Sequence, residues 1–437
     1  MPVGPVVLIL AAALPLVVVA AVTALRAPFL LLAVYAAVIP WGSSFRLPLG
    51  LPGPLATISS LVGLAATVGL ALHLALGGRR APTIPRSLPA SILLLAVAVL
   101  TLPWSINPTI TINDLMALAG LVGLYVVVTL VRPARREMDV LEAGIAAGGA
   151  ITGMVALQQL ATGTIALTGA GLPRFETAGG GGEGGDPNVT AAVLILPLAV
   201  ALARGVDRTG LVRLAYLAAG GVTALAIMLT GSRGGMFTAL VVVAVVARLG
   251  RPLATLLVAL VPAVVAAITL ASLAPDTLTA RVGKTGSTGR TDIWRDGLRT
   301  CPRYCVQGAG WGTFARVYEE TLLSTPGSMP FGRSMRAEAH NMWIGTVVEG
   351  GILAVVLLGA VFVFTVSDLQ AVPRDVRAPP LAAVIGILVA NMFLSTQDFK
   401  YFWLVLMYAA LTTVAHRTDH PAERLPSPLA TGRQAHG

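Results

Sequence analysis

The chain has 437 residues, of which 56% are hydrophobic and only 11% are charged. A soluble protein of this length would form roughly two or three domains with a much larger charged share, so the composition excludes a soluble class. The net charge of +10 is typical of nucleic-acid-binding proteins. Here the basic residues lie in short loops between apolar segments rather than along one face, which excludes nucleic acid as a partner.

Apolar segments long enough to cross a lipid bilayer follow one another along almost the whole chain. A transmembrane helix needs about 20 largely apolar residues. The opening segment lacks the basic region and the cleavage site of a signal peptide, so we interpret it as a retained span. The sequence predicts an all-α, polytopic integral membrane protein with about 12 to 14 transmembrane helices, some short enough to be re-entrant or broken. The predicted spans are residues 5–24, 27–41, 57–77, 89–104, 114–131, 140–160, 188–203, 213–231, 235–248, 252–273, 342–365, 380–396 and 399–415.

One long polar loop interrupts this hydrophobic pattern. We expect a transmembrane helix bundle of about 10 spans in residues 1–273 and a long extracytoplasmic loop with short helices in residues 274–341. Three transmembrane helices follow in residues 342–415, and residues 416–437 form a polar, disordered tail.

Clusters of arginine determine the expected orientation of the spans. The short loops that contain them all lie on one side of the membrane if the spans alternate, and the positive-inside rule makes that side cytoplasmic. The long loop is then extracytoplasmic, the C-terminal tail is cytoplasmic and the N-terminus lies outside, although merging or splitting one early span reverses the last expectation. Four tryptophans fall at outer span ends, where an aromatic belt is expected. The residues concerned are Arg79, Arg80, Arg86, Arg132, Arg135, Arg136, Arg204, Arg208, Arg213, Arg248, Arg251, Arg374 and Arg377, with Trp41, Trp104, Trp343 and Trp403.

Of the five histidines, only His340 faces the outer side in this topology. It lies where the long loop enters a span, and Asn341, Glu349 and Gly351 follow it on the predicted helix. A histidine in this position is often only a helix cap at the membrane interface. The basic loop that precedes it favours a second interpretation, a catalytic base, because an imidazole with a pKa of about 6.5 exchanges protons near neutral pH.

Arg233 lies in a polar break between two apolar spans, flanked by Ser232 and by Gly234. The simplest interpretation is an arginine that snorkels from a helix end. Such arginines usually gather at cytoplasmic ends, whereas this one faces outward. Its guanidinium and the backbone N–H groups of the neighbouring glycines together suit a phosphate group.

Shorter patterns occur in the two longest outer loops. Asp186 followed by Pro187 is typical of a helix start. Residues 289–299 place Arg290 and Trp294 at helical spacing, and residues 308–312 predict a tight glycine turn, although a surface helix and an ordinary turn explain them equally well. Cys301 and Cys305 favour a disulfide over two free thiols if their compartment is oxidising. Zinc is disfavoured, because no further cysteine or histidine pair completes a ligand set.

In their order, spacing and sidedness, these residues resemble the O-antigen ligase and polymerase family of bacterial envelope proteins. The resemblance extends over residues 186–351, and the two cysteines are not part of the family's pattern. Its marks are Asp186-Pro187-Asn188, Ser232-Arg233-Gly234, Arg290 to Trp294 with the glycine turn, and His340-Asn341 with Glu349 and Gly351.

This resemblance implies an O-antigen ligase-like glycosyltransferase of the bacterial cytoplasmic (inner) membrane. Such an enzyme moves a glycan from an undecaprenyl-diphosphate carrier to an acceptor hydroxyl on the lipid A core or a comparable glycolipid or glycan, at the outer face and without a cofactor. His340 would act as the base, and arginines would hold the diphosphate. The candidate substrate-binding residues are Arg174, Arg233, Arg290, Trp294, Arg336, Asn341 and Glu349.

The chemistry of the donor agrees with this set of residues. A glycosyl diphosphate has a good leaving group, so its departure needs charge neutralisation, which arginine supplies with paired donors. In membrane oligosaccharyltransferases that use a metal, the first outer loop carries a catalytic acid. Residues 42–56 contain no Asp or Glu, which favours a metal-independent enzyme, with Asp398 and Glu349 as alternative acids.

Other functions remain open at the level of the sequence. A polymerase that joins lipid-linked repeat units shares the ligase's donor, and a protein O-oligosaccharyltransferase is a further alternative. A transporter predicts inverted repeats and polar, broken helices at mid-depth, and the sequence has no clear internal repeat. In a scaffold or sensor, His340 and Arg233 would be incidental.

Overall fold

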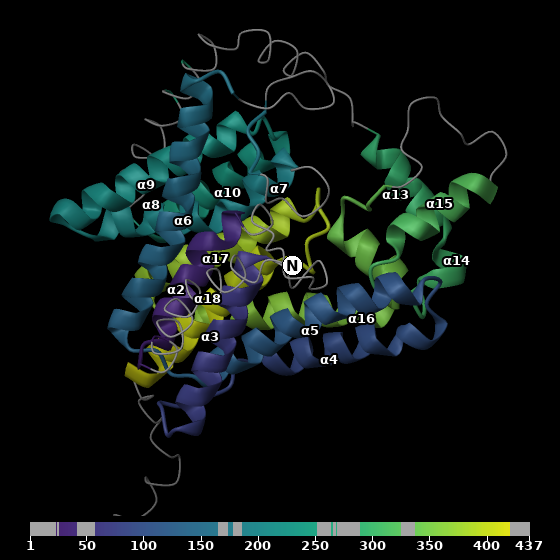
Figure 1. The fold of residues 1–437 in the computed structure, drawn as a ribbon, viewed down its shortest axis with the longest axis horizontal. Helices are drawn as coiled ribbons and strands as arrows, with labels where there is room; N and C mark the ends of the chain where they lie inside the picture. Colours follow the sequence, from purple (N-terminus) through teal and green to yellow (C-terminus); the bar gives the residue numbers. More distant parts are fainter. Residues whose placement is uncertain are drawn as a thin grey trace, which may run out of the picture.

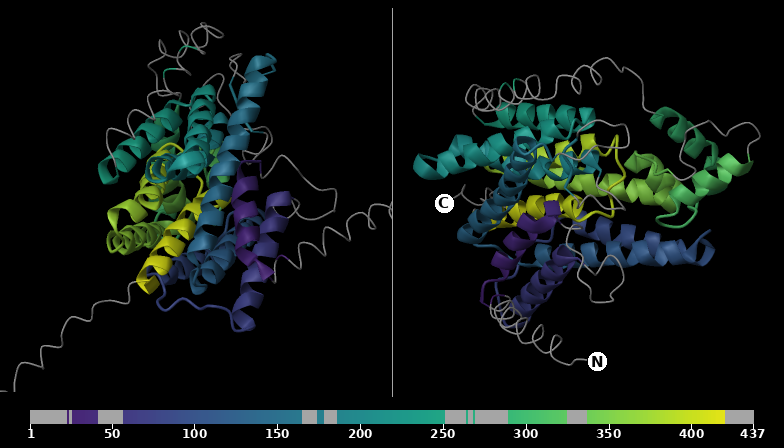
Figure 2. Two further views of the ribbon diagram at one scale, coloured as in Figure 1. Left: turned by 90° about the vertical axis from the view of Figure 1, so that its left-hand side faces the viewer. Right: turned by 45° about the horizontal axis from the view of Figure 1, so that its top comes forward.

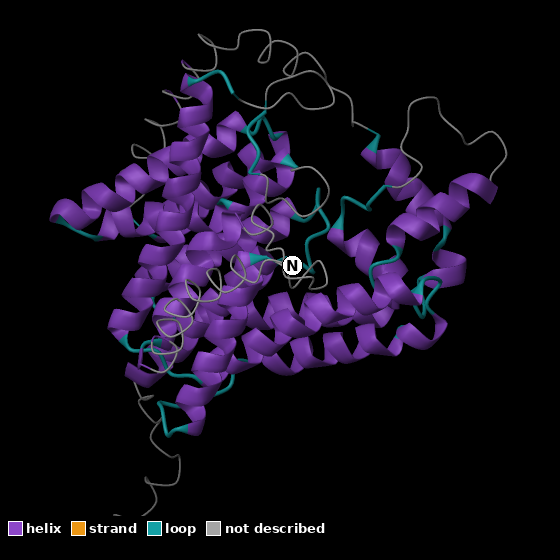
Figure 3. Ribbon diagram, in the orientation of Figure 1, coloured by secondary structure: helices purple, strands orange, loops and turns teal. Residues whose placement is uncertain are grey.

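The computed structural model describes residues 26–41, 57–164, 174–177, 186–250, 289–324 and 337–419, together with residues 23, 264 and 268. Within these residues the regular structure is helical and contains no strand, as Figure 3 shows. The predicted all-α class is confirmed. The candidate residue Arg336 and the predicted spans 5–24 and 252–273 lie outside the described residues.

Every other predicted span corresponds to a helix. Seven helical stretches in the described part of the chain are long and apolar enough to cross a membrane. The helices α2, α10 and α17 are shorter than these. The helices are α2 (Pro28–Val38), α3 (Ile58–Ala75), α4 (Ser87–Leu100), α5 (Pro108–Leu130), α6 (Arg135–Ala161), α7 (Pro187–Val193), α8 (Ile195–Asp207), α9 (Gly210–Leu229), α10 (Arg233–Leu249), α13 (Arg290–Arg299), α14 (Cys301–Tyr304), α15 (Phe314–Ser324), α16 (Met342–Gln370), α17 (Arg374–Ala390) and α18 (Lys400–Asp419).

The centre of the bundle is formed by α8 and α18, which are buried along almost their whole apolar length. Helices α6, α9, α10 and α17 pack against α8, and helices α5, α16 and α17 pack against α18 (Figures 1 and 2). The outer helices expose large apolar side chains such as Leu64, Leu93 and Leu240. Apolar exposure on this scale is unfavourable in water and favourable in lipid, so this is a polytopic membrane protein.

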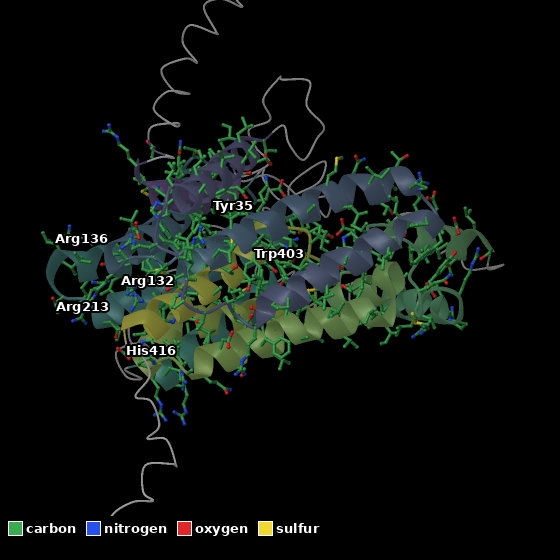
Figure 4. All side chains as sticks on the ribbon, turned by 90° about the horizontal axis from the view of Figure 1, so that it is seen from below. Tyr35, Arg132, Arg136, Arg213, Trp403 and His416 are labelled. Carbon is green, nitrogen blue, oxygen red and sulfur yellow. A yellow bond between two sulfur atoms is a disulfide. The ribbon has the colours of Figure 1, made fainter. Side chains whose placement is uncertain are left out.

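One end of the bundle collects basic residues that are distant in the sequence. Arg132, Arg136, Arg213 and His416 lie together there, at the left of Figure 4. The buried carboxylate of Glu142 accepts hydrogen bonds from Arg204 Nε at 2.7 Å and Nη2 at 2.6 Å. The loops that contain Arg132, Arg136 and Arg213 therefore share one end of the bundle, as the orientation argument expects.

The opposite end carries the helices of the long loop. Helices α13, α14 and α15 pack against α16, and the glycine turn between α14 and α15 contacts the segment joining α4 to α5 (Figure 1, right). The aromatic belt expected at this end is wrong for Trp403. Its side chain is only 1% exposed and packs against Tyr125 and Phe402 inside the bundle.

Candidate functional site

Four charged or titratable side chains from separate segments meet at the end that carries the long loop. The charges of Arg290 and Asp186 both act on His340. The charge of Arg233 acts in turn on Arg290. These residues come from the starts of α7, α10, α13 and α16, so the fold brings together the residues that the sequence singled out.

His340 is held by the residue that follows it. Asn341 caps α16, where its side-chain oxygen accepts hydrogen bonds from the backbone N–H groups of Trp343 at 3.0 Å and Ile344 at 3.2 Å. Its own backbone N–H donates to Ser395 Oγ. The cap leaves His340 with a left-handed φ of 45°, a conformation that few residues other than glycine adopt. Asn341 thus fixes the backbone next to His340, and its side-chain oxygen is occupied by this cap.

Arg290 is the first residue of α13, after Gly289 in a left-handed conformation. Trp294, one turn later, donates its indole N–H to the carbonyl oxygen of Ala339 at 2.9 Å. This bond ties α13 to the residue directly before His340. The remaining arginines of α13 are engaged elsewhere, since Arg295 and Arg299 form ion pairs with Asp292 and Asp296 on the same helix.

The Arg233 side of the site is built by a network of caps. Ser232 caps α10 by accepting from the Gly235 backbone N–H, and its hydroxyl donates to Asn188 Oδ1 at 2.8 Å. Asn188 in turn donates to Asp186, which caps α7 as the sequence predicts. Arg174 braces this network through the carbonyl oxygen of Thr230 and through Asn188.

A small pocket lies at this network, and its lining includes the polar residues Asn188, Ser232 and Arg290. Gly234 and Gly235 also line it, together with apolar residues of α17 and the segment after it. The pocket therefore combines guanidinium, hydroxyl and amide groups with an apolar wall. This combination suits an anionic group attached to an apolar chain.

Arg290 forms no hydrogen bond or ion pair within the described part of the chain, although it is half-buried. Burial and the neighbouring Arg233 lower the pKa of Arg290, while Asp186 partly offsets them. Arginine remains charged in proteins, so its donors are free for a ligand. An anion that accepts from this guanidinium would form a short, charge-assisted pair of hydrogen bonds.

The imidazole of His340 is mainly uncharged at neutral pH. Burial lowers the pKa of His340 below its usual 6.5, and the Arg290 guanidinium lowers it further, against a smaller opposing effect of Asp186. The Nδ1 atom of His340 has no hydrogen-bond partner in the described residues. A neutral imidazole with a free nitrogen is in the state that a general base requires.

Glu349 is not among the groups whose charges act on Arg290 or His340. It is buried in α16, and its Oε1 atom accepts from the Phe314 backbone N–H at 3.0 Å. The carboxylates that act on it electrostatically are Asp398 and Asp114. Sequence reasoning considered Asp398 only as an alternative acid and did not consider Asp114, because neither residue stands in a motif.

The two cysteines lie in the same region, and both are partly exposed. Cys301 and Cys305 are joined by a disulfide across the short helix α14. In the described part of the chain, no three histidine, cysteine or carboxylate side chains are arranged to hold a metal ion.

The fold and the site define an all-α polytopic membrane protein with a partly buried arginine and histidine site at one end of its bundle. Residues 218–359 match the family model described as O-antigen ligase. This match agrees with the resemblance that the sequence indicates, and it supports a ligase- or polymerase-type membrane glycosyltransferase. No curated protein matches the chain.

Proposed function

We propose that this protein transfers a glycan from an undecaprenyl-diphosphate carrier to an acceptor hydroxyl of an envelope glycolipid or glycan. The observation that carries the proposal is the half-buried Arg290, which has no partner in the described residues and lies beside Arg233 and His340. Two guanidinium groups at one place suit a diphosphate, whose oxygens accept paired hydrogen bonds. The pocket with an apolar wall suits the start of a prenyl chain.

In the proposed reaction, the acceptor oxygen forms a bond to the anomeric carbon of the glycan. The bond between that carbon and the diphosphate oxygen breaks, and its electron pair goes to the diphosphate. Arg233 and Arg290 stabilise the negative charge that develops there. His340 takes the proton from the acceptor hydroxyl. Positioned base catalysis of this kind typically contributes about 100-fold to 10,000-fold in rate.

The proposal assigns charge neutralisation to arginines rather than to a metal ion. It also places the site at the extracytoplasmic face of the cytoplasmic membrane, because Arg132, Arg136 and Arg213 gather at the other end of the bundle and the positive-inside rule makes that end cytoplasmic. Turnover that persists in excess EDTA is the expected result. Loss of turnover on chelation, restored by a divalent cation, would contradict the metal-free assignment.

The experiment that tests the function uses purified protein in lipid nanodiscs and measures release of undecaprenyl diphosphate from a glycan-loaded donor in the presence of acceptor. His340→Ala is expected to lower the rate by about 100-fold or more while donor binding is retained. Unchanged turnover in this variant would disprove the role of His340.

Arg233→Ala serves as the complementary variant, and it is expected to weaken donor binding or to lower the rate. If neither donor binding nor the rate changes, Arg233 has no role in the reaction and is an arginine that snorkels from a helix end. The exposed Arg295, which pairs with Asp292 on α13, supplies the matched control. Arg295→Ala is expected to leave both binding and rate unchanged.

A further inference from the structure

Four carboxylates meet beside the arginine and histidine site, and their placement is not explained by that site. Asp114 lies in the second turn of α5, Glu349 in α16, and Asp398 in the segment before α18. Glu338 lies two residues before His340. The charges of Asp114 and Glu338 both act on Asp398, and those of Asp398 and Asp114 act on Glu349. We call these four residues the acidic cluster.

Most oxygen atoms of the acidic cluster have no hydrogen-bond donor. Glu349 is only 6% exposed, and its Oε2 atom has no partner in the described residues, although its Oε1 atom does. Asp398 Oδ1 accepts from the indole N–H of Trp311 at 2.8 Å, and no described group donates to its second oxygen. Asp114 is partly exposed and accepts no hydrogen bond in the same part of the chain. A buried acceptor without a donor is costly, so the Oε2 atom of Glu349 calls for a ligand or water that donates.

The backbone around the acidic cluster is shaped to bring these groups together. The helix α16 is interrupted at Gly351, whose φ is 76°. The glycine turn fills this interruption, with the N–H groups of Ala309 and Gly310 donating to the carbonyl oxygens of Val348 and Glu349. At Gly312, a Cβ atom would lie 1.8 Å from Asp114 Oδ2. Only glycine therefore lets this turn approach Asp114 and Glu349 at the same time.

No basic residue of the described chain neutralises the acidic cluster. The groups that act on Asp398 are other carboxylates and Trp311, and burial together with this repulsion raises the pKa of Asp398 to about 8. Burial and the neighbouring Asp186 also raise the pKa of Glu338. Carboxylates whose charges act on one another share protons rather than ionise together. The cluster is therefore a set of hydrogen-bond acceptors with a few shared protons.

We propose that the acidic cluster binds the hydroxyl groups of the acceptor sugar, next to His340. Sugar hydroxyls are the donors that these carboxylate oxygens lack, and hydrogen bonds to carboxylates are among the stronger ones. Glu338 connects the two sites, because Asp186 of the basic site acts on it electrostatically. A sugar held by the cluster thus lies beside the base that takes its proton.

The opposite charges of the arginine site and the acidic cluster also help to direct the donor and the acceptor to different parts of the site. A diphosphate is attracted by Arg233 and Arg290, whereas each carboxylate of the acidic cluster that stays ionised repels it, so one direction of donor binding is favoured. Specificity of this kind needs an unfavourable interaction with the wrong ligand as well as a favourable one with the right ligand. The inference rests on the proposed function, since it assigns the acceptor to one half of the same site.

The test measures binding of two probes to the purified protein in nanodiscs. Saturation-transfer NMR with a panel of methyl glycosides reports on the acidic cluster, and binding of geranyl diphosphate reports on the arginines. Glu349→Gln keeps an oxygen that accepts from the Phe314 backbone N–H, and it replaces the other carboxylate oxygen by an NH₂ group, which donates. Asp114→Asn changes a partly exposed side chain and is the second variant. Glu319→Gln, which changes a carboxylate that pairs with Arg316 on α15, is the matched control.

Glu349→Gln and Asp114→Asn are each expected to weaken glycoside binding by about 10-fold to 100-fold, as loss of a charge-assisted hydrogen bond predicts. Binding of geranyl diphosphate is expected to persist in both variants, and Glu319→Gln is expected to bind both probes as the unchanged protein does. Thermal unfolding of each variant shows whether it is folded. If no glycoside binds the unchanged protein, or if both cluster variants bind glycosides as it does, the inference is overturned. The Arg290→Ala variant tests the proposed function separately. If this variant still binds geranyl diphosphate, the assignment of Arg290 to the diphosphate site is contradicted, while the inference about the acidic cluster is unaffected.

Discussion

The two ends of the bundle use the same kind of residue in opposite ways. At one end, Arg204 is locked to Glu142 by two hydrogen bonds, and the Tyr408 hydroxyl donates to the same carboxylate at 2.8 Å. At the other end, Arg290 is half-buried and has no such partner in the described residues. A buried arginine that is satisfied by the protein holds helices together, whereas one that is left with free donors is available to a ligand.

The largest effect on stability is expected at the paired end. The side chains of Arg204 and Glu142 are only 15% and 3% exposed, so Arg204→Ala leaves a buried carboxylate without its counter-ion. Breaking a buried pair in this way typically costs about 3–5 kcal/mol. Thermal unfolding of the purified protein in detergent measures the loss, and the remaining folded fraction is expected to transfer glycan at the normal rate.

A double variant tests the reason for this loss. Arg204→Met combined with Glu142→Gln removes both charges and keeps an acceptor for Tyr408, so most of the stability is expected to return. If the double variant is as unstable as Arg204→Ala, the cost comes from lost packing rather than from an unpaired charge.

The opposite pattern is expected at the site end. Arg290→Ala is predicted to lower the rate of glycan transfer by about 100-fold to 1,000-fold, the usual cost of removing one group that stabilises developing charge. Its unfolding temperature is expected to stay unchanged, because Arg290 forms no hydrogen bond or ion pair with the described residues. Arg290→Lys keeps the positive charge but lacks the planar, paired donors of a guanidinium. Its rate is expected to lie between those of the unchanged protein and Arg290→Ala. If Arg290→Ala lowers the unfolding temperature, Arg290 has a structural role like that of Arg204, and the proposed difference between the two ends is contradicted.

Much of the fold could be predicted from the sequence, because its signals are local. Apolar runs of membrane-spanning length identify the helices. The start of α7 at Asp186 and Pro187 follows from the chemistry of helix capping, which involves only neighbouring residues. The meeting of Arg233, Arg290 and His340 was inferred from the resemblance to a family rather than from any local pattern.

Contacts between distant segments could not be predicted. The acidic cluster joins Asp114, Glu349 and Asp398, which lie on separate elements and form no motif. The pairing of Arg204 with Glu142 likewise depends on how α6 packs against α8. Sequence reasoning also proposed that Trp294 and Asn341 bind substrate. In the structure the Trp294 indole donates to the Ala339 carbonyl oxygen and the Asn341 side chain accepts from the first turn of α16, two contacts that the sequence did not predict.

A smaller effect on stability is predicted for the glycine that interrupts α16. At Gly351 the φ of 76° is strained for other residues, and a Cβ atom would lie 2.4 Å from the Val306 carbonyl oxygen. Gly351→Ala is therefore expected to cost about 1–3 kcal/mol. The matched control is Gly359→Ala on the same helix, where a Cβ atom would meet nothing within 4 Å. Equal unfolding temperatures for the two variants would show that the interruption of α16 is not a rigid feature.

The smallest effects are predicted in the pH dependence of the reaction. The base must be neutral to act, so kcat/KM falls as the pH drops through the pKa of His340, which burial and Arg290 hold below 6.5. Asp186→Asn removes a negative charge that favours the protonated imidazole. The pKa of His340 then falls further, and the acid limb of the profile moves to lower pH.

Arg290→Gln removes a positive charge that opposes protonation of the same imidazole. The pKa of His340 rises, and the acid limb of the residual activity is expected to move to higher pH. Rate measurements across the acid range compare the two variants with the unchanged protein. Opposite shifts can arise only if both charges act on one titrating base. Shifts in the same direction, or no shifts, would mean that the acid limb reflects the titration of a group other than His340. The base of the reaction would then be a different residue.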